Sequence, residues 1–256
     1  MEEKTLDVTI IMPALNEEKN ILLAIKNTLK AFEESGISGE IIVINDGSSD
    51  RTEGLVNNFM QADKRVHLVS HDKPKGIGAS FWVGVDNAQG ETIVLIPGDN
   101  EVDPWEILRY FRLLKHVDIV IPFVFNKEVR SLFRNALSFI YRFIINSTFL
   151  VNFNYTNGTV LYRKFILKEL DFRSTSFFFQ TDILVRVVKK GYLFAEVPYR
   201  LGLRKEGASK AVTFPSLLQV TKGYLRLVGD FHFTRALKAT SHFSKDSLTA
   251  IRRSGK

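Results

Sequence analysis

The stretch Glu91–Pro104, with the sequence ETIVLIPGDNEVDP, runs from an apolar strand directly into an acidic loop. Residues Thr92–Ile96 are apolar at almost every position, which is typical of a strand buried on both faces in the middle of a parallel sheet. The strand must end at Pro97 and Gly98. This junction predicts an α/β fold in which an acidic loop follows a central strand.

Three carboxylates follow the predicted strand at alternating positions: Asp99, Glu101 and Asp103. In open α/β sheets, ligands bind at the carboxyl ends of the strands. Clustered carboxylates there can hold a hard divalent cation, and that cation can hold a diphosphate. For Asp103 we favour a helix cap, because Pro104 suits the first position of a helix. For Asp99 and Glu101 a cation site and a solvated turn are both open at this point.

The composition is that of a folded soluble protein. The chain has 256 residues, 45% of them hydrophobic and 25% charged, enough for one large α/β domain or for one domain with an appendage. It contains no cysteine, which excludes disulfides, thiolate metal sites and a cysteine nucleophile and fits a reducing compartment. Residues Met1–Asp7 do not resemble a signal peptide. We therefore expect a cytoplasmic location.

The net charge favours anionic partners. A formal charge of +7 suits nucleic acid, anionic lipid headgroups and nucleotide diphosphates. The 21 phenylalanines are compatible with RNA binding, but the sequence has no RNP-type or zinc-knuckle pattern. We therefore expect no nucleic-acid partner.

Strand-like and helix-like runs alternate through the first half of the chain. Asn16 looks like a helix cap, with Glu17 in the first turn and Gly36 at the helix end. The other expected helices cover 55–59, 78–88 and 107–114, and the expected strands cover 8–12, 41–44, 66–69, 92–96 and 119–123. This order predicts a Rossmann-like, mostly parallel sheet with helices on both faces.

The second half is less regular. Residues 132–151 form a wide apolar helix with a narrow polar stripe, and Arg142 within it argues against a transmembrane span. Core packing and an interfacial position at a membrane are both open for this helix. A strand at 159–162, a helix at 181–190, a strand at 193–197 and an amphipathic stretch at 217–233 follow. The basic end, 235–256, suits a solvated, disordered or membrane-touching tail.

Polar loops end the first two predicted strands, at 13–17 (PALNE) and 45–50 (NDGSSD). Glu17 and Asp46 can accept hydrogen bonds from a base or a ribose, and the helix starts beside them offer N–H groups to phosphate. Together the two loops predict a nucleotide pocket. The glycine-rich run 73–79 lacks the spacing of a P-loop, and no G-x-G-x-x-G follows the first strand. ATPase and dinucleotide-dehydrogenase functions are therefore unsupported.

These motifs together resemble family 2 glycosyltransferases with the GT-A fold, and among them most closely the polyprenyl-phosphate (dolichol-phosphate) sugar synthases. The matching stretches are IIMPALNEE (10–18), IIVINDGSSDRT (41–52), KGIGASFWVGVDNAQGE (75–91), IPGDNEVDP (96–104), FFFQTDILVRVVKKGYLFAEVPY (177–199) and RKEGASK (204–210). The resemblance spans roughly residues 8–210, and its last motif is the most specific. It implies a GT-A domain over 1–215, with 131–151 as an amphipathic, possible membrane-interfacial insert, and an amphipathic helix with a basic tail over 216–256.

By this resemblance, a nucleotide-sugar pocket is implied at Pro13, Leu15, Glu17, Asp46, Gly47, Gly76 and Asp99. The family's D-x-D metal motif is altered, since Pro97 stands at the first Asp position, Asp99 at the second and Glu101 at the polar position that follows. The resemblance implies Mg²⁺ or Mn²⁺ held by Asp99 and Glu101, with more water than usual among its ligands.

The resemblance also implies a phosphate-binding set for the acceptor, formed by Arg130 or Arg134 with Arg204, Ser209 and Lys210. Guanidinium groups suit diphosphate and acceptor phosphate, although solvated surface charges explain Arg130 and Arg134 equally well. Asp182 stands where many relatives have an acidic residue near the acceptor, and a partner for a helix dipole is the alternative. Asp99, Asp182 and Arg204 are the catalytic candidates.

The implied reaction is an inverting transfer from a UDP- or GDP-linked sugar. A polyprenyl phosphate is already ionised and needs no base, whereas a saccharide hydroxyl would need a carboxylate. The wide apolar helix at 132–151 favours the lipid acceptor, and with it peripheral association with an anionic membrane surface at its cytoplasmic face. A glycan acceptor and a degenerate nucleotide-sugar-binding protein are the alternatives.

Overall fold

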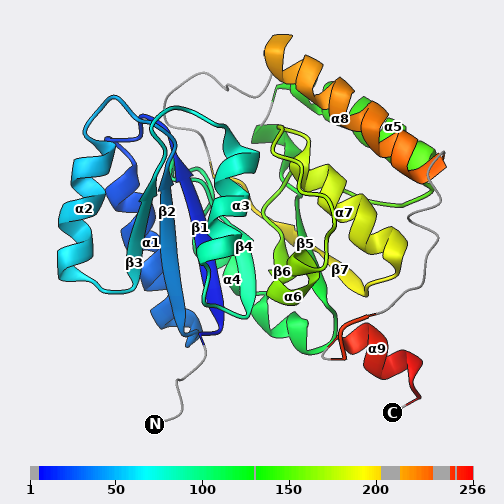
Figure 1. The fold of residues 1–256 in the computed structure, drawn as a ribbon, viewed down its shortest axis with the longest axis horizontal. Coiled ribbons are helices and arrows are strands. Elements are labelled where there is room, and N and C mark those ends of the chain that lie inside the picture. The colour runs from blue at the N-terminus through cyan, green and yellow to red at the C-terminus, as the bar shows by residue number, and fades with distance from the viewer. Residues whose placement is uncertain (1–5, 130, 203–213, 233–242, 246, 256) are drawn as a thin grey trace.

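A computed structural model of the chain describes residues 6–129, 131–202, 214–232, 243–245 and 247–255. Seven strands form one sheet in the order β3-β2-β1-β4-β6-β5-β7 (Figure 1). Their bounds are β1 Val8–Ala14, β2 Gly39–Asn45, β3 Val66–Ser70, β4 Thr92–Leu95, β5 Ile119–Val124, β6 Leu161–Arg163 and β7 Phe194–Tyr199. All neighbouring strands are parallel except β6, which runs antiparallel to both β4 and β5. The mostly parallel α/β sheet expected from the sequence is confirmed.

Helices cover both faces of this sheet (Figure 1). Their bounds are α1 Ile21–Ser35, α2 Thr52–Ala62, α3 Ile77–Asn87, α4 Pro104–Leu108, α5 Leu132–Phe149, α6 Lys164–Lys168, α7 Phe179–Lys190, α8 Phe214–His232 and α9 Leu248–Arg253. Strand β1 shows why two cores form. Ile10 and Met12 pack in one hydrophobic cluster with α1 and α4, while Ile11 packs in the other with α3 and α7. Successive strand residues point to opposite faces, so one strand of continuous apolar sequence serves both cores.

Two helix predictions are wrong. Asn16 is not the cap of the first helix, which begins at Ile21 after Asn20. Asn16 instead takes a left-handed conformation, φ 58°, and its side-chain oxygen accepts from the backbone N–H of Ser49, which ties the first two strand-end loops together. The helix expected at 107–114 is also broken. It divides into α4 and a 3₁₀ turn, and the hydroxyl of Tyr110 at the break donates to the carbonyl of Pro198 at 2.6 Å.

Helices α5 and α8 lie side by side along one end of the molecule (Figure 1). The Phe149 ring packs against Tyr224 and Phe231 of α8, and the Tyr224 hydroxyl is 2.8 Å from that of Thr148. Leu227 of α8 is fully buried in the core that α3 and α7 share. The inner faces of both helices are therefore part of the core, while the outer face of α5 is exposed. No helix in the described part of the chain is long and apolar enough to cross a membrane.

The described part of the basic tail is folded. Helix α9 is held by Asp118, a buried residue just before β5, whose carboxylate accepts from the backbone N–H groups of Leu248 and Thr249 at 2.8 and 3.1 Å. The Thr249 hydroxyl also donates to Asp118 and accepts from the backbone N–H of Leu193. This segment is thus attached to the sheet rather than disordered.

Candidate active site

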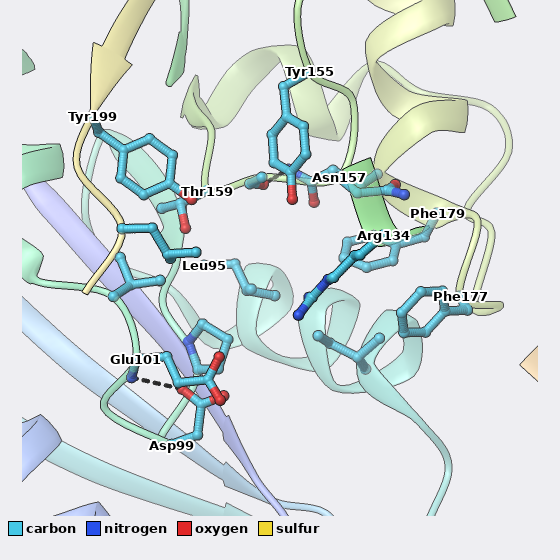
Figure 2. A pocket seen from close by; sticks show the side chains of 16 residues that line it. Leu95, Asp99, Glu101, Arg134, Tyr155, Asn157, Thr159, Phe177, Phe179 and Tyr199 are labelled. Carbon is cyan, nitrogen blue, oxygen red and sulfur yellow. Dashed lines mark hydrogen bonds between the residues drawn. The ribbon is translucent and has the colours of Figure 1, made fainter. Parts of the chain in front are cut away.

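A cavity opens where the carboxyl end of β4 meets the first turns of α5 and α7 (Figure 2). Its floor is the acidic loop, with Asp99 and Glu101 side by side. The Asp99 carboxylate accepts from the backbone N–H of Glu101 at 3.0 Å, and Asn100 between them is left-handed, φ 57°. The Asn100 side chain is anchored by Asn27 of α1 at 2.9 Å. These constraints hold both carboxylates toward one cavity.

Asp103 has the structural role expected of it. Its carboxylate accepts from the backbone N–H of Trp105 at 3.0 Å and caps α4, with Pro104 in the first turn. Asp103 lines a neighbouring groove rather than the cavity that holds Asp99. Of the three alternating acidic residues, Asp99 and Glu101 therefore line the cavity, and Asp103 caps a helix.

Arg134 reaches into the cavity from the first turn of α5, with its guanidinium directed toward the acidic loop (Figure 2). Its backbone N–H is capped by the Ser131 hydroxyl at 3.3 Å, which fixes the start of the helix. A cationic side chain thus faces Asp99 and Glu101 across open space. That arrangement suits an anionic group that binds a cation on one side and a guanidinium on the other.

Polar side chains form the opposite wall, and sequence reasoning missed them. Tyr155, Asn157, Thr159 and Tyr199 extend into the cavity in Figure 2. Gly158 permits this packing, because a Cβ at that position would lie 2.7 Å from the Tyr155 ring. The Asn157-Gly158 turn was the available signal, but a turn motif does not reveal that its neighbours face a site.

Asp46 fastens the loop before α3. Its carboxylate accepts from the backbone N–H groups of Lys75 and Gly76, each at 2.8 Å, and its Oδ1 lies 2.7 Å from Nδ1 of His71. Burial alone would raise the pKa of Asp46, but these hydrogen bonds outweigh it and lower that pKa. Gly47 is left-handed, φ 73°, and a Cβ there would lie 2.8 Å from the backbone of Lys73.

The loop after β1 is tied to the loop after β2. The backbone N–H of Glu17 donates to the Thr52 hydroxyl at 2.8 Å, and the Glu17 carboxylate accepts from the Asn20 side chain at 2.9 Å. Pro13, Leu15 and Glu17 are all partly exposed beside this junction. The residues predicted to bind the nucleotide therefore share one edge of the sheet. This edge adjoins the cavity that Ile77 helps to line.

Asp182 is placed differently from the catalytic role expected of it. Its carboxylate is buried and accepts two hydrogen bonds from Arg186, at 2.8 and 3.1 Å, and Arg186 also binds Asp230 of α8. Gln180 lines the cavity, but Asp182 does not. Because a carboxylate bound in this way is withheld from an acceptor, the structure favours a role for Asp182 in joining α7 to α8.

The remaining acceptor candidates, Arg130, Arg204, Ser209 and Lys210, lie outside the described residues. Among the described residues, no group of three or more His, Cys, Asp or Glu side chains is arranged to hold a metal. Asp99 and Glu101 form a pair, so a cation here would take its other ligands from substrate and water.

The fold is that of the GT-A glycosyltransferases. Solved structures of glucosyl-3-phosphoglycerate synthase from Mycobacterium tuberculosis match 88% of the chain at 19% identity. The complex with Mn²⁺, UDP and phosphoglyceric acid has a TM-score of 0.66 over 79% of that protein, and the complex with Mg²⁺ and UDP has a TM-score of 0.65 over 80%.

The sequence profile of glycosyl transferase family 2 matches residues 9–171, more than half of the chain. The chain belongs to this family and is a glycosyltransferase.

Curated relatives are polyprenyl-phosphate sugar transferases. A dolichyl-phosphate beta-glucosyltransferase of Trichomonas vaginalis is 33% identical over 39% of this chain and 32% of its own length. An undecaprenyl-phosphate 4-deoxy-4-formamido-L-arabinose transferase of Salmonella paratyphi B is 29% identical over 55% of this chain and 43% of its own length. The matched region spans less than half the length of either relative.

Proposed function

We propose that this enzyme transfers a sugar, with inversion, from a UDP- or GDP-linked donor to the phosphate of a polyprenyl phosphate. The observation that carries the proposal is the position of Arg134. It faces Asp99 and Glu101 within the cavity, and it belongs to α5, whose outer face is apolar and exposed. An acceptor with a phosphate head and a hydrocarbon tail matches that combination. The names of the curated relatives, which act on dolichyl and undecaprenyl phosphates, support the same acceptor class.

The acidic loop fits a divalent cation. Asp99 and Glu101 offer hard oxygen ligands at one end of the cavity, and Mg²⁺ commonly binds one or two carboxylates together with substrate phosphates and water. When bound, Mg²⁺ or Mn²⁺ would neutralise negative charge on the donor diphosphate. The solved neighbours with Mn²⁺ or Mg²⁺ and UDP support this choice of ions.

In the proposed reaction, an oxygen of the acceptor phosphate attacks the anomeric carbon. The bond from that carbon to the donor diphosphate breaks, and the nucleoside diphosphate leaves with the bonding electrons. The acceptor is ionised before it attacks, so no general base is needed. The burial of Asp182 against Arg186 agrees with this mechanism. Arg134 would hold a phosphate group by paired hydrogen bonds.

We place the enzyme at a membrane surface through α5 and α8, as a peripheral protein at the cytoplasmic face. Large apolar side chains project from both helices: Leu132, Phe133, Phe143, Leu217 and Leu225 are 88%, 70%, 63%, 62% and 61% exposed. Exposed apolar side chains gathered on neighbouring helices are a common mark of a surface that binds a protein or a membrane. An amphipathic helix pair with this face can enter the headgroup region, and the net charge of +7 favours anionic lipids.

The experiment combines the purified enzyme, vesicles containing polyprenyl phosphate, and a panel of labelled UDP- and GDP-sugars with Mn²⁺ or Mg²⁺. The expected product is a glycolipid that mild acid cleaves, as befits a sugar attached through a phosphodiester. Label that appears only on an added oligosaccharide would contradict the lipid-phosphate acceptor and favour a hydroxyl acceptor. The panel also identifies the sugar and the base.

A further inference from the structure

His71 is a buried polar residue that no step above uses. It directly follows β3, and its side chain is 4% exposed. Nδ1 lies 2.7 Å from Oδ1 of Asp46, whereas Nε2 is buried and has no hydrogen-bond partner among the described residues. An imidazole buried in this way is uncommon unless one of its nitrogens has a defined task.

The tautomer follows from the partner. The Asp46 carboxylate at neutral pH is only an acceptor, so Nδ1 of His71 must carry the proton that it donates to Oδ1. The second ring nitrogen has no described partner to compete for this arrangement. The bond joins two residues at the ends of neighbouring strands, β2 and β3, and therefore crosses the edge of the sheet.

The hydrogen bonds to Asp46 leave little of its carboxylate unused. Oδ1 accepts from His71 and from the backbone of Lys75, and Oδ2 accepts from the backbone of Gly76. A carboxylate has about four acceptor positions. Three are therefore occupied within the described structure, and the remaining one is on Oδ2. Rotation of the carboxylate would break all three bonds at once.

We propose that His71 is a positioning residue of the donor site, which sets the Asp46 carboxylate so that the remaining acceptor position on Oδ2 meets an N–H or O–H of the donor's nucleoside. Through Asp46 it also holds the backbone of Lys75 and Gly76 and so the start of α3, where Ile77 lines the cavity. This inference rests on the proposed function, because it assumes that a nucleoside diphosphate binds beside Asp46. His71 itself does not touch the reacting atoms.

A purely structural role for His71 makes a different prediction. If His71 only stabilised the fold, its replacement would lower stability and overall activity, and the loss would not be confined to the KM for the donor. If it positions Asp46, the loss lies in donor binding. An interaction with the nucleoside is the same in the ground state and in the transition state, so its loss raises KM for the donor and leaves kcat nearly unchanged.

The test compares His71→Asn with His71→Gln. The Asn amide nitrogen superposes on Nδ1 and keeps the donor to Asp46, whereas the Gln amide lies nearer the Nε2 position and loses it. We expect His71→Gln to raise the donor KM and the Kd for UDP or GDP by about tenfold, and His71→Asn to stay within about threefold of the wild type. His67→Gln is the control, since His67 lies on β3 but is 45% exposed and faces Glu40.

Calorimetry with UDP, GDP and Mn²⁺ distinguishes a failure of the proposed function from a failure of the role assigned to His71. Wild-type protein that binds neither nucleotide would overturn the proposed function. Wild-type protein that binds, with His71→Gln binding equally well, would overturn only the role of His71. Equal losses in the Asn and Gln variants, or a loss confined to kcat, would also overturn it. Thermal unfolding of each variant shows whether a loss is one of folding.

Discussion

At the residue scale, the acidic loop shows how three similar side chains acquire different tasks. Asp99 and Glu101 face the cavity because the left-handed Asn100 turns the chain between them, while Asp103 turns back to cap α4. The spacing of the three carboxylates does not contain this difference. It arises from the Pro104 that follows Asp103 and from the Asn27 side chain that anchors Asn100.

The first prediction separates Asp99 from Asp103. Asp99→Asn removes a charge that would help hold the donor diphosphate and its cation, so we expect transfer to fall at least about 100-fold. Asp103→Asn should keep near-normal activity, because Asn caps helices about as well as Asp. The measurement is initial transfer rate at saturating Mn²⁺. Equal losses in the two variants would show that the loop acts as a unit and that Asp99 has no separate role.

The strand-end positions of three candidate site residues were predictable at this scale. Glu17, Asp46 and Asp99 were expected at strand ends because parallel strands bring their carboxyl ends to one edge. His71, Tyr155 and Tyr199 were not, since a lone His or Tyr has no spacing in the sequence that reveals what it faces. Asp182 was expected to be catalytic because of its position in the sequence. The sequence shows that Arg186 lies one helical turn away, but it does not show that the Asp182–Arg186 pair is buried.

At the scale of elements, α5 combines two kinds of surface. Its inner face packs against α8, its first turn supplies Arg134 to the cavity, and its outer face is apolar. The apolar periodicity of residues 132–151 predicted a helix. It left core packing and an interfacial position equally open, because a pattern of hydrophobic residues does not say which half of a wide apolar face meets the protein. The inner side of the helix packs in the core, and the exposed outer side is the one that we propose to meet a membrane.

The second prediction concerns that outer face. Leu132→Ser combined with Phe133→Ser should weaken binding to phosphatidylcholine–phosphatidylglycerol vesicles at least tenfold, because each exposed side chain contributes about 1.5–3 kcal/mol when buried in an apolar phase. Leu23→Ser is the control, since Leu23 is 52% exposed on α1, away from α5 and α8. Co-sedimentation measures the binding. A similar loss in the Leu23 variant would argue against a specific face.

At the scale of the whole molecule, the two ends of the sheet have different tasks. The carboxyl ends of the strands carry the candidate site, while the region before β5 holds the C-terminal segment through Asp118. The periodicity of the sequence predicted where the first five strands lie along the chain, but not their order in the sheet. It did not predict the place of β6, because a strand of three residues has too little pattern to show its direction, nor the attachment of α9, which depends on contacts 130 residues apart.

The third prediction tests that attachment. Asp118→Ala leaves the N–H groups of Leu248 and Thr249 without their acceptor, and we expect a loss of about 2–4 kcal/mol in the free energy of unfolding. Thr249→Val removes only the hydroxyl and should cost less. Urea unfolding measures both, and donor affinity should be unchanged in each. A fully stable Asp118→Ala variant would show that α9 is held by its other contacts.

The late position of β6 in the chain also affects the order in which strands can pair during synthesis. Within the described residues, the partners of β5 are β6 and β7, and both of these follow it in the chain, whereas β1 to β4 can pair among themselves. Leu161 of β6 emerges from the ribosome 37 residues after Val124 of β5. At ordinary rates of synthesis, β5 therefore waits roughly two to seven seconds without a partner strand. During that interval the nascent chain exposes an unpaired apolar strand next to an incomplete sheet. Exposed segments of this kind are the ones that chaperones bind.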